Sequence, residues 1–84
     1  MKIFEFEEKV WEIEGIRVIV RASSDETVSD YNFKNGSQEN WRITQLIEKR
    51  IQPKIGEREV IIIQGDGEQP HGRVILRTVR RTYA

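Results

Sequence analysis

A ten-residue stretch decides the predicted fold: Trp11-Glu12-Ile13-Glu14-Gly15-Ile16-Arg17-Val18-Ile19-Val20. Apolar and charged side chains alternate on both sides of Glu14-Gly15. This pattern is typical of two strands joined by a tight turn, where glycine tolerates the positive φ. Pairing Ile13 with Ile16 would place Trp11 opposite Val18 on one face of the sheet. The sequence therefore predicts a β-hairpin with one apolar and one charged face.

The flanking segments fit this hairpin less simply. Phe4, Phe6 and Val10 have the parity opposite to that of Trp11 and Ile13. Either a bulge near residues 8–9 switches the faces, or both faces of this strand are partly covered. Downstream, the polar segment 22–37 has turn-forming residues at both ends and is typical of an exposed loop. Residues 27–33 also alternate, so a short third strand is the alternative.

A helix is predicted from Gln38 to Arg50, with Ser37 as its cap and no Gly or Pro inside it. Trp41 lies away from the apolar stripe of this helix. Proline at 53 and glycine at 56 are expected to end it. The stripe that would face the core contains Ile43, Leu46, Ile47 and Ile51.

Two further strands are predicted over residues 58–64 and 73–83. The first is rich in β-branched residues, and the turn-rich connection 65–72 is too short for a crossover helix, so the two strands would pair antiparallel. The predicted order is β-β-(β)-α-β-β. This is an α+β fold with an antiparallel sheet of four or five strands and one α-helix packed on one face.

Length and composition favour a single domain over residues 1–84. The chain has 84 residues and no cysteine, which excludes disulfides, thiolate nucleophiles and cysteine-based zinc sites. No apolar run approaches the length of a membrane helix, and the acidic amino terminus is unlike a signal peptide. We therefore expect a cytoplasmic protein that makes no membrane contact.

Residues with catalytic chemistry are scarce. His71 is the only histidine, and Asp66 and Glu68 are the only acids close to it in the sequence. A metal-assisted hydrolase could use such a trio, but all three lie on one short connection, where a solvated loop is the more common explanation. We expect no enzymatic activity, no cofactor, no metal and no small-molecule substrate.

The leading functional prediction is a protein–protein interaction module, such as an adaptor, an inhibitor or a regulatory subunit, with self-association as one form of it. Aromatic residues and arginine are enriched at the centres of protein interfaces. The alternative for Trp41 is that it folds back and caps the core. The predicted contact residues lie near the start of the helix: Trp41, Arg42, Tyr31 and Phe33.

The alternative function is nucleic-acid binding by arginines, because the zero net charge is unevenly distributed. Residues 1–14 hold five glutamates and two lysines, whereas residues 71–84 hold four arginines and no acid. If these segments are neighbours, they neutralise each other; if they are separated, a basic face is exposed. The candidate phosphate-binding residues are Arg17, Arg21, Arg73, Arg77 and Arg81.

Overall fold

The amino-terminal segment is a helix, not a strand. The computed structural model describes residues 1–23 and 25–83. In it, α1 (Ile3–Glu14) begins where Glu5 folds back to accept the backbone N–H of Lys2 at 2.9 Å, and it ends at Gly15, whose φ is 67°. The predicted hairpin with a turn at Glu14-Gly15 is therefore wrong. Gly15 does adopt the left-handed conformation, but it does so at the end of a helix and not in a hairpin turn.

The periodicity of α1 explains the conflict between parities in the sequence. Ile3, Phe6, Val10 and Glu14 are its buried residues, and they recur every three or four positions. This is the spacing of one face of a helix. Phe4 and Phe6 alternate with charged residues as in a strand, but Phe4 is exposed and Phe6 is fully buried.

The sheet contains β1 (Arg17–Val20) and β2 (Val60–Ile63), which pair antiparallel with Arg17 opposite Ile63 and Val20 opposite Val60. Val18, Val20 and Ile62 point into the core, whereas Ile19 on the opposite face is exposed. The expected sheet of four or five strands with a single helix is thus wrong. In the described part of the chain, two strands are paired, and segment 27–33 contributes only an isolated bridge between Thr27 and Lys2.

The central helix starts later and ends later than predicted. It runs without a break through α2 (Ile43–Leu46), the π-helical turn η1 (Ile47–Ile51) and α3 (Gln52–Ile55). Pro53 does not stop it; the wider π turn precedes the proline, which has no N–H to donate to the preceding turn. Gly56, with a φ of 68°, follows the last turn. Of the predicted stripe, Ile43, Leu46 and Ile51 are buried and Ile47 is half-buried.

The carboxyl-terminal segment is a short helix, α4 (Leu76–Arg81), where a strand over 73–83 was expected. Leu76 and Val79 are buried one turn apart, so the helical period places both on one face. The segment before α4 pairs with the segment before α2, since Arg42 bridges Ile75 and the N–H of Leu76 donates to the carbonyl of Trp41 at 2.8 Å. The returning strand is therefore replaced by two helix starts lying side by side.

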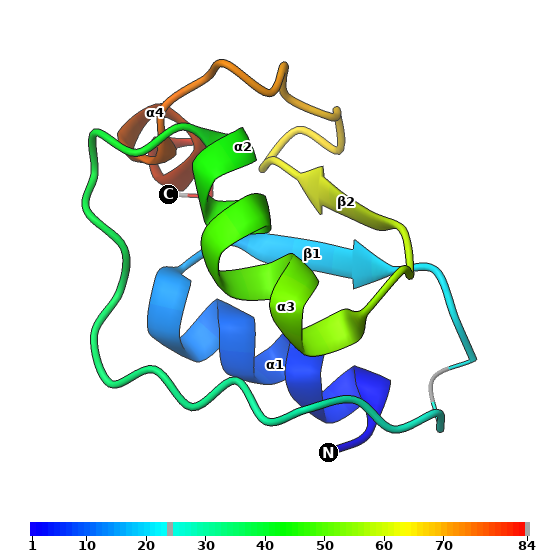
Figure 1. The fold of residues 1–84 in the computed structure, drawn as a ribbon. Coiled ribbons are helices and arrows are strands. Elements are labelled where there is room, and N and C mark those ends of the chain that lie inside the picture. The colour runs from blue at the N-terminus through cyan, green and yellow to red at the C-terminus, as the bar shows by residue number, and fades with distance from the viewer. Residues whose placement is uncertain (24, 84) are drawn as a thin grey trace.

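Figure 1 shows how these elements enclose the core. Buried side chains from α1, both strands, the α2–η1–α3 helix and α4 form one hydrophobic cluster. The segment 25–42 passes along α1 on its way to α2, and Tyr31 within it packs edge-on against Phe6 at 5.5 Å between ring centroids. At the end of the sheet, the Tyr83 hydroxyl lies between the strands, accepting from the N–H of Arg17 and donating to the carbonyl of Ile63. No helix in the described residues is long and apolar enough to cross a membrane.

Candidate functional site

Glu14 is the most unusual residue in the core. It is the last residue of α1 and is 2% exposed, in line with the apolar residues Phe6 and Val10 on the inward face of the helix. Moving a carboxylate out of water is strongly unfavourable unless it is paired and hydrogen-bonded. Its surroundings must therefore supply both opposite charge and donors.

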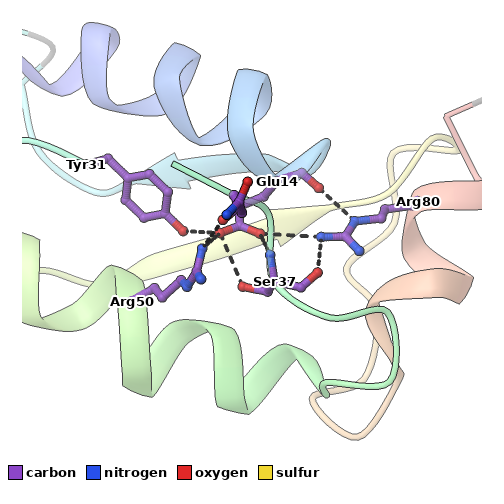
Figure 2. A network of polar contacts seen from close by, with 6 residues as sticks. Glu14, Tyr31, Ser37, Arg50 and Arg80 are labelled. Carbon is purple, nitrogen blue, oxygen red and sulfur yellow. Dashed lines mark hydrogen bonds and ion pairs between the residues drawn. The ribbon is translucent and has the colours of Figure 1, made fainter. Parts of the chain in front are cut away.

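The Glu14 network, drawn in Figure 2, supplies both. Oε2 accepts from the Tyr31 hydroxyl at 2.5 Å, from Ser37 Oγ at 3.2 Å and from Arg50 Nη1 at 2.9 Å. Oε1 accepts from the backbone N–H of Ser37 at 2.7 Å and from Arg80 Nη2 at 3.3 Å. Both carboxylate oxygens are thus fully engaged by residues from three separate parts of the chain.

The two arginines also tie backbone to the network. Arg80 donates from Nε to the carbonyl of Glu14 at 2.7 Å and from Nη2 to the carbonyl of Ser37 at 3.0 Å. Arg50 donates to the carbonyl of Asn35 at 2.7 Å. These bonds join the end of α1, the segment 31–37, η1 and α4 through one carboxylate. Ser37, the predicted helix cap, serves here as a donor to Glu14.

The phenol of Tyr31 is held in its neutral form. Burial, followed by the hydrogen bond to the Glu14 carboxylate and by its negative charge, raises the pKa of Tyr31 well above its usual range. The phenolate would be both desolvated and next to another anion. Tyr31 therefore keeps its proton, and donates to Glu14, well above the pH at which an exposed tyrosine ionises.

This gives a pH dependence of a definite sign. An unfolded tyrosine releases its proton near pH 10, whereas folded Tyr31 retains it, so the free energy of unfolding should fall as the pH rises above about 10. In a Tyr83→Phe variant, where Tyr31 is the remaining tyrosine, tyrosinate absorbance should appear together with loss of the circular dichroism of the fold. Tyrosinate appearing near pH 10 in a protein that is still folded would contradict the prediction.

Arg50 connects the buried carboxylate to the molecular surface. Its guanidinium carbon lies 4.3 Å from the ring centroid of Phe33 and 5.7 Å from that of Trp41. Lys54 Nζ lies 5.5 Å from the Phe33 centroid, and Lys49 Nζ lies 5.1 Å from the Trp41 centroid. Cations at these distances are attracted to the faces of aromatic rings. We call these five residues the aromatic–cation surface: Phe33, Trp41, Lys49, Arg50 and Lys54.

The four predicted contact residues occupy different positions relative to this surface. Phe33 and Trp41 lie in it, and both are half-buried against the core. Arg42 is exposed next to Trp41, at the bridge to Ile75. Tyr31 is fully buried, so its side chain supports the surface from beneath, through its edge contact with Phe33 at 4.9 Å.

The five predicted phosphate-binding arginines do not form one face. Arg17 lies over the Trp11 ring and 3.9 Å from Glu8, and Arg21 lies 3.7 Å from Glu59. The other three, Arg73, Arg77 and Arg81, are exposed on or just before α4. The strand parity expected to unite Arg73, Arg77 and Arg81 is wrong, because residues 76–81 are helical.

The two oppositely charged ends of the chain are in contact, since the ring of Trp11 packs edge-on against that of Tyr83 at 5.2 Å between centroids. Arg80 reaches the carboxylate of Glu14, while the exposed glutamates of α1 make no ion pair with Arg73, Arg77 or Arg81 within the described residues. Within the described residues, Arg80 is thus the one arginine of segment 71–84 that pairs with an acid of α1.

The side chains of Asp66 and His71 make only local hydrogen bonds in the described part of the chain. Asp66 accepts the backbone N–H of Glu68 at 2.9 Å, and His71 Nδ1 accepts that of Arg73 at 3.2 Å. Over residues 1–23 and 25–83, no group of three His, Asp or Glu side chains is arranged to hold a metal ion.

Comparisons with protein-family models, with curated proteins and with solved structures found no match to this chain. The fold and the site together define a small α+β protein in which a two-stranded sheet and its helices are joined around one buried glutamate.

Proposed function

We propose that this chain is a non-enzymatic binding module that captures a protein partner through the aromatic–cation surface. The observation that carries the proposal is the arrangement of Trp41 and Phe33, two half-buried rings linked by the guanidinium of Arg50. Tryptophan and arginine dominate the binding energy of many protein interfaces. A cytoplasmic location, expected from the sequence, is part of the same proposal.

The rigidity of this surface supports the proposal. Arg50 is fixed by Glu14 and by the Asn35 carbonyl, and Phe33 packs on the buried Tyr31. Side chains that are already ordered lose little conformational entropy when a partner binds. The buried Glu14 carboxylate thus favours binding without itself contacting the partner.

The charges indicate the chemistry of the partner. Lys49 and Lys54 flank the two rings, and Arg42 is exposed beside Trp41. A complementary surface would present an apolar or aromatic side chain to the rings and carboxylates around it. We therefore propose a partner whose contact region is acidic at its rim.

Substitution of Trp41 tests the proposal. Trp41→Ala should weaken partner capture from lysate by at least about tenfold, because interface tryptophans commonly contribute 2 kcal/mol or more. Phe4→Ala is the matched control, since Phe4 is an exposed aromatic residue on α1 and does not belong to this surface. Capture that is equally strong for Trp41→Ala and wild type would overturn the assignment.

Nucleic-acid binding is the second candidate, supported by the exposure of Arg73, Arg77 and Arg81, which form no ion pair with the acids of α1 in the described residues. Each phosphate contact would release counterions and make retention fall steeply with salt. Nuclease treatment of the same lysate separates the two functions. Capture that is lost with nuclease and with Arg77→Glu/Arg81→Glu, and retained by Trp41→Ala, would favour nucleic acid.

A further inference from the structure

The exposed face of α1 carries a shallow apolar groove with an acidic rim. A hollow of about 230 Å³ is lined by Phe4, Glu5, Glu8, Lys9 and Glu12. Phe4 is 54% exposed, a large fraction for a phenylalanine that packs on no other aromatic ring in the described structure. Three glutamates against one lysine leave the rim negative.

The outer face of α4 is the electrostatic complement of this groove. Arg77 and Arg81 are exposed one turn apart, with the exposed Thr78 between them. Neither arginine side chain forms a hydrogen bond or an ion pair within residues 1–23 and 25–83. Their positive charges are therefore available for intermolecular contact.

We propose that α4 of one copy docks on the α1 groove of a second copy, with Arg77 and Arg81 against Glu8 and Glu12. The spacing of the two pairs is matched: each pair is four residues apart on a helix, a rise of about 6 Å. Arginine binds carboxylates through paired N–H donors and stacks on aromatic faces. The two arginines of one copy thus contact the Phe4 ring of the other copy and the acidic rim of its α1 groove.

The contact we propose joins two copies. Figure 1 shows α4 on the opposite side of the molecule from the amino-terminal end of α1, where Phe4 lies, and no ion pair joins Arg77 or Arg81 to Glu8 or Glu12 within the described residues. Glu8 is 3.9 Å from Arg17 of its own chain, but both side chains are more than half exposed, and such pairs are weak. Arginine from a second copy can replace Arg17 with little loss.

The assembly is head-to-tail, because two different faces meet. A pair of copies retains one free α1 groove and one free α4 face, so the association continues into short chains unless the rotation closes a ring. The self-association should increase with protein concentration and weaken with salt, since the charges at the rim of the groove are exposed. The aromatic–cation surface takes no part in it, so this inference is independent of the proposed function.

Charge reversal provides the test, read by sedimentation or light scattering at low salt. The wild type should show an average mass that rises with concentration and returns to the monomer in high salt. Glu8→Lys/Glu12→Lys and Arg77→Glu/Arg81→Glu should each weaken self-association by at least about tenfold, because two attractive contacts become repulsive. Glu5 is left unchanged because it accepts the Lys2 N–H at the start of α1.

Mixing the two variants is the decisive arm. The variant with the reversed α1 groove keeps Arg77 and Arg81, which can dock on the unchanged α1 groove of the variant with the reversed α4. The introduced lysines of the one can likewise pair with the introduced glutamates of the other. An equimolar mixture should therefore associate although neither variant does so alone. Phe4→Ala should weaken association of the wild type and leave capture of the protein partner intact. Reversal of the exposed acids Asp30 and Glu57, Asp30→Lys/Glu57→Lys, is the matched control and should preserve association.

Three results would overturn the inference. These are a wild type that stays monomeric at all concentrations in low salt, single variants that associate like the wild type, and a mixture that stays monomeric. Circular dichroism of each variant establishes that it is folded before its association is measured.

Discussion

Replacing Glu14 with alanine should lower the free energy of unfolding by about 3–5 kcal/mol, because it leaves two arginines without their shared buried counterion. Arg50 and Arg80 have side chains that are 19% and 22% exposed, so water compensates only part of the lost interaction. Tyr31 and Ser37 would also lose their acceptor. A loss of this size is a large part of the 5–15 kcal/mol that stabilises a typical domain.

Denaturant unfolding followed by circular dichroism measures this change. Glu12→Ala is the matched control, since Glu12 is an exposed glutamate two residues earlier on the same helix. It should change the free energy of unfolding by no more than about 0.5 kcal/mol. Equal effects of the two substitutions would mean that the Glu14 network contributes nothing to stability.

Phe6→Ala should destabilise the protein by about 3–5 kcal/mol, the usual range for removing a buried phenylalanine. Phe6 is fully buried, and its ring meets the edge of Tyr31, so the substitution opens a cavity directly beneath the segment that carries Phe33. The ring contact adds to the area that is lost.

The control for Phe6 is again on α1. Phe4→Ala removes the same side chain from a position that is 54% exposed, and its effect on unfolding should stay below about 1 kcal/mol. The same denaturant titration compares both variants. In a strand, Phe4 and Phe6 would lie on the same face and would be buried or exposed together. Equal destabilisation would therefore contradict the helical assignment of residues 3–14.

The helical period of α1 was not recognised from the sequence because its fourth inward residue is charged. Ile3, Phe6 and Val10 are followed on the same face by Glu14. Trp11 and Ile13, which lie outside this inward face, alternate with glutamates as they would in a strand. A glutamate in register with an apolar helical stripe is the signal that could have identified both the helix and the buried site.

The carboxyl-terminal helix was missed for a related reason. α4 buries only Leu76 and Val79, which is too short a stripe to distinguish from strand alternation in a segment rich in β-branched residues. Tertiary contacts decide the outcome, since the pairing of residues 74–76 with 41–43 places the start of α4 beside α2.

Local signals did predict other parts of the structure. The apolar stripe of the central helix, the strand within residues 58–64 and the glycine at 56 after the helix are all present. Trp41 and Phe33 do lie close to the central helix. The Glu14 network could not be predicted, because its donors come from positions 31, 37, 50 and 80 and meet only in the folded chain.

The buried Glu14 carboxylate should hold segment 31–41 in place and so organise the aromatic–cation surface. Hydrogen exchange, followed by mass spectrometry on Glu14→Gln, measures this directly, and Glu12→Gln is the control. If Glu14→Gln does not fold, Arg50→Met removes the same link from the other side.

We predict that segment 31–41 exchanges faster in folded Glu14→Gln than in Glu12→Gln, while β1 and β2 keep their protection. Unchanged exchange of segment 31–41 in a folded Glu14→Gln or Arg50→Met variant would contradict the claim.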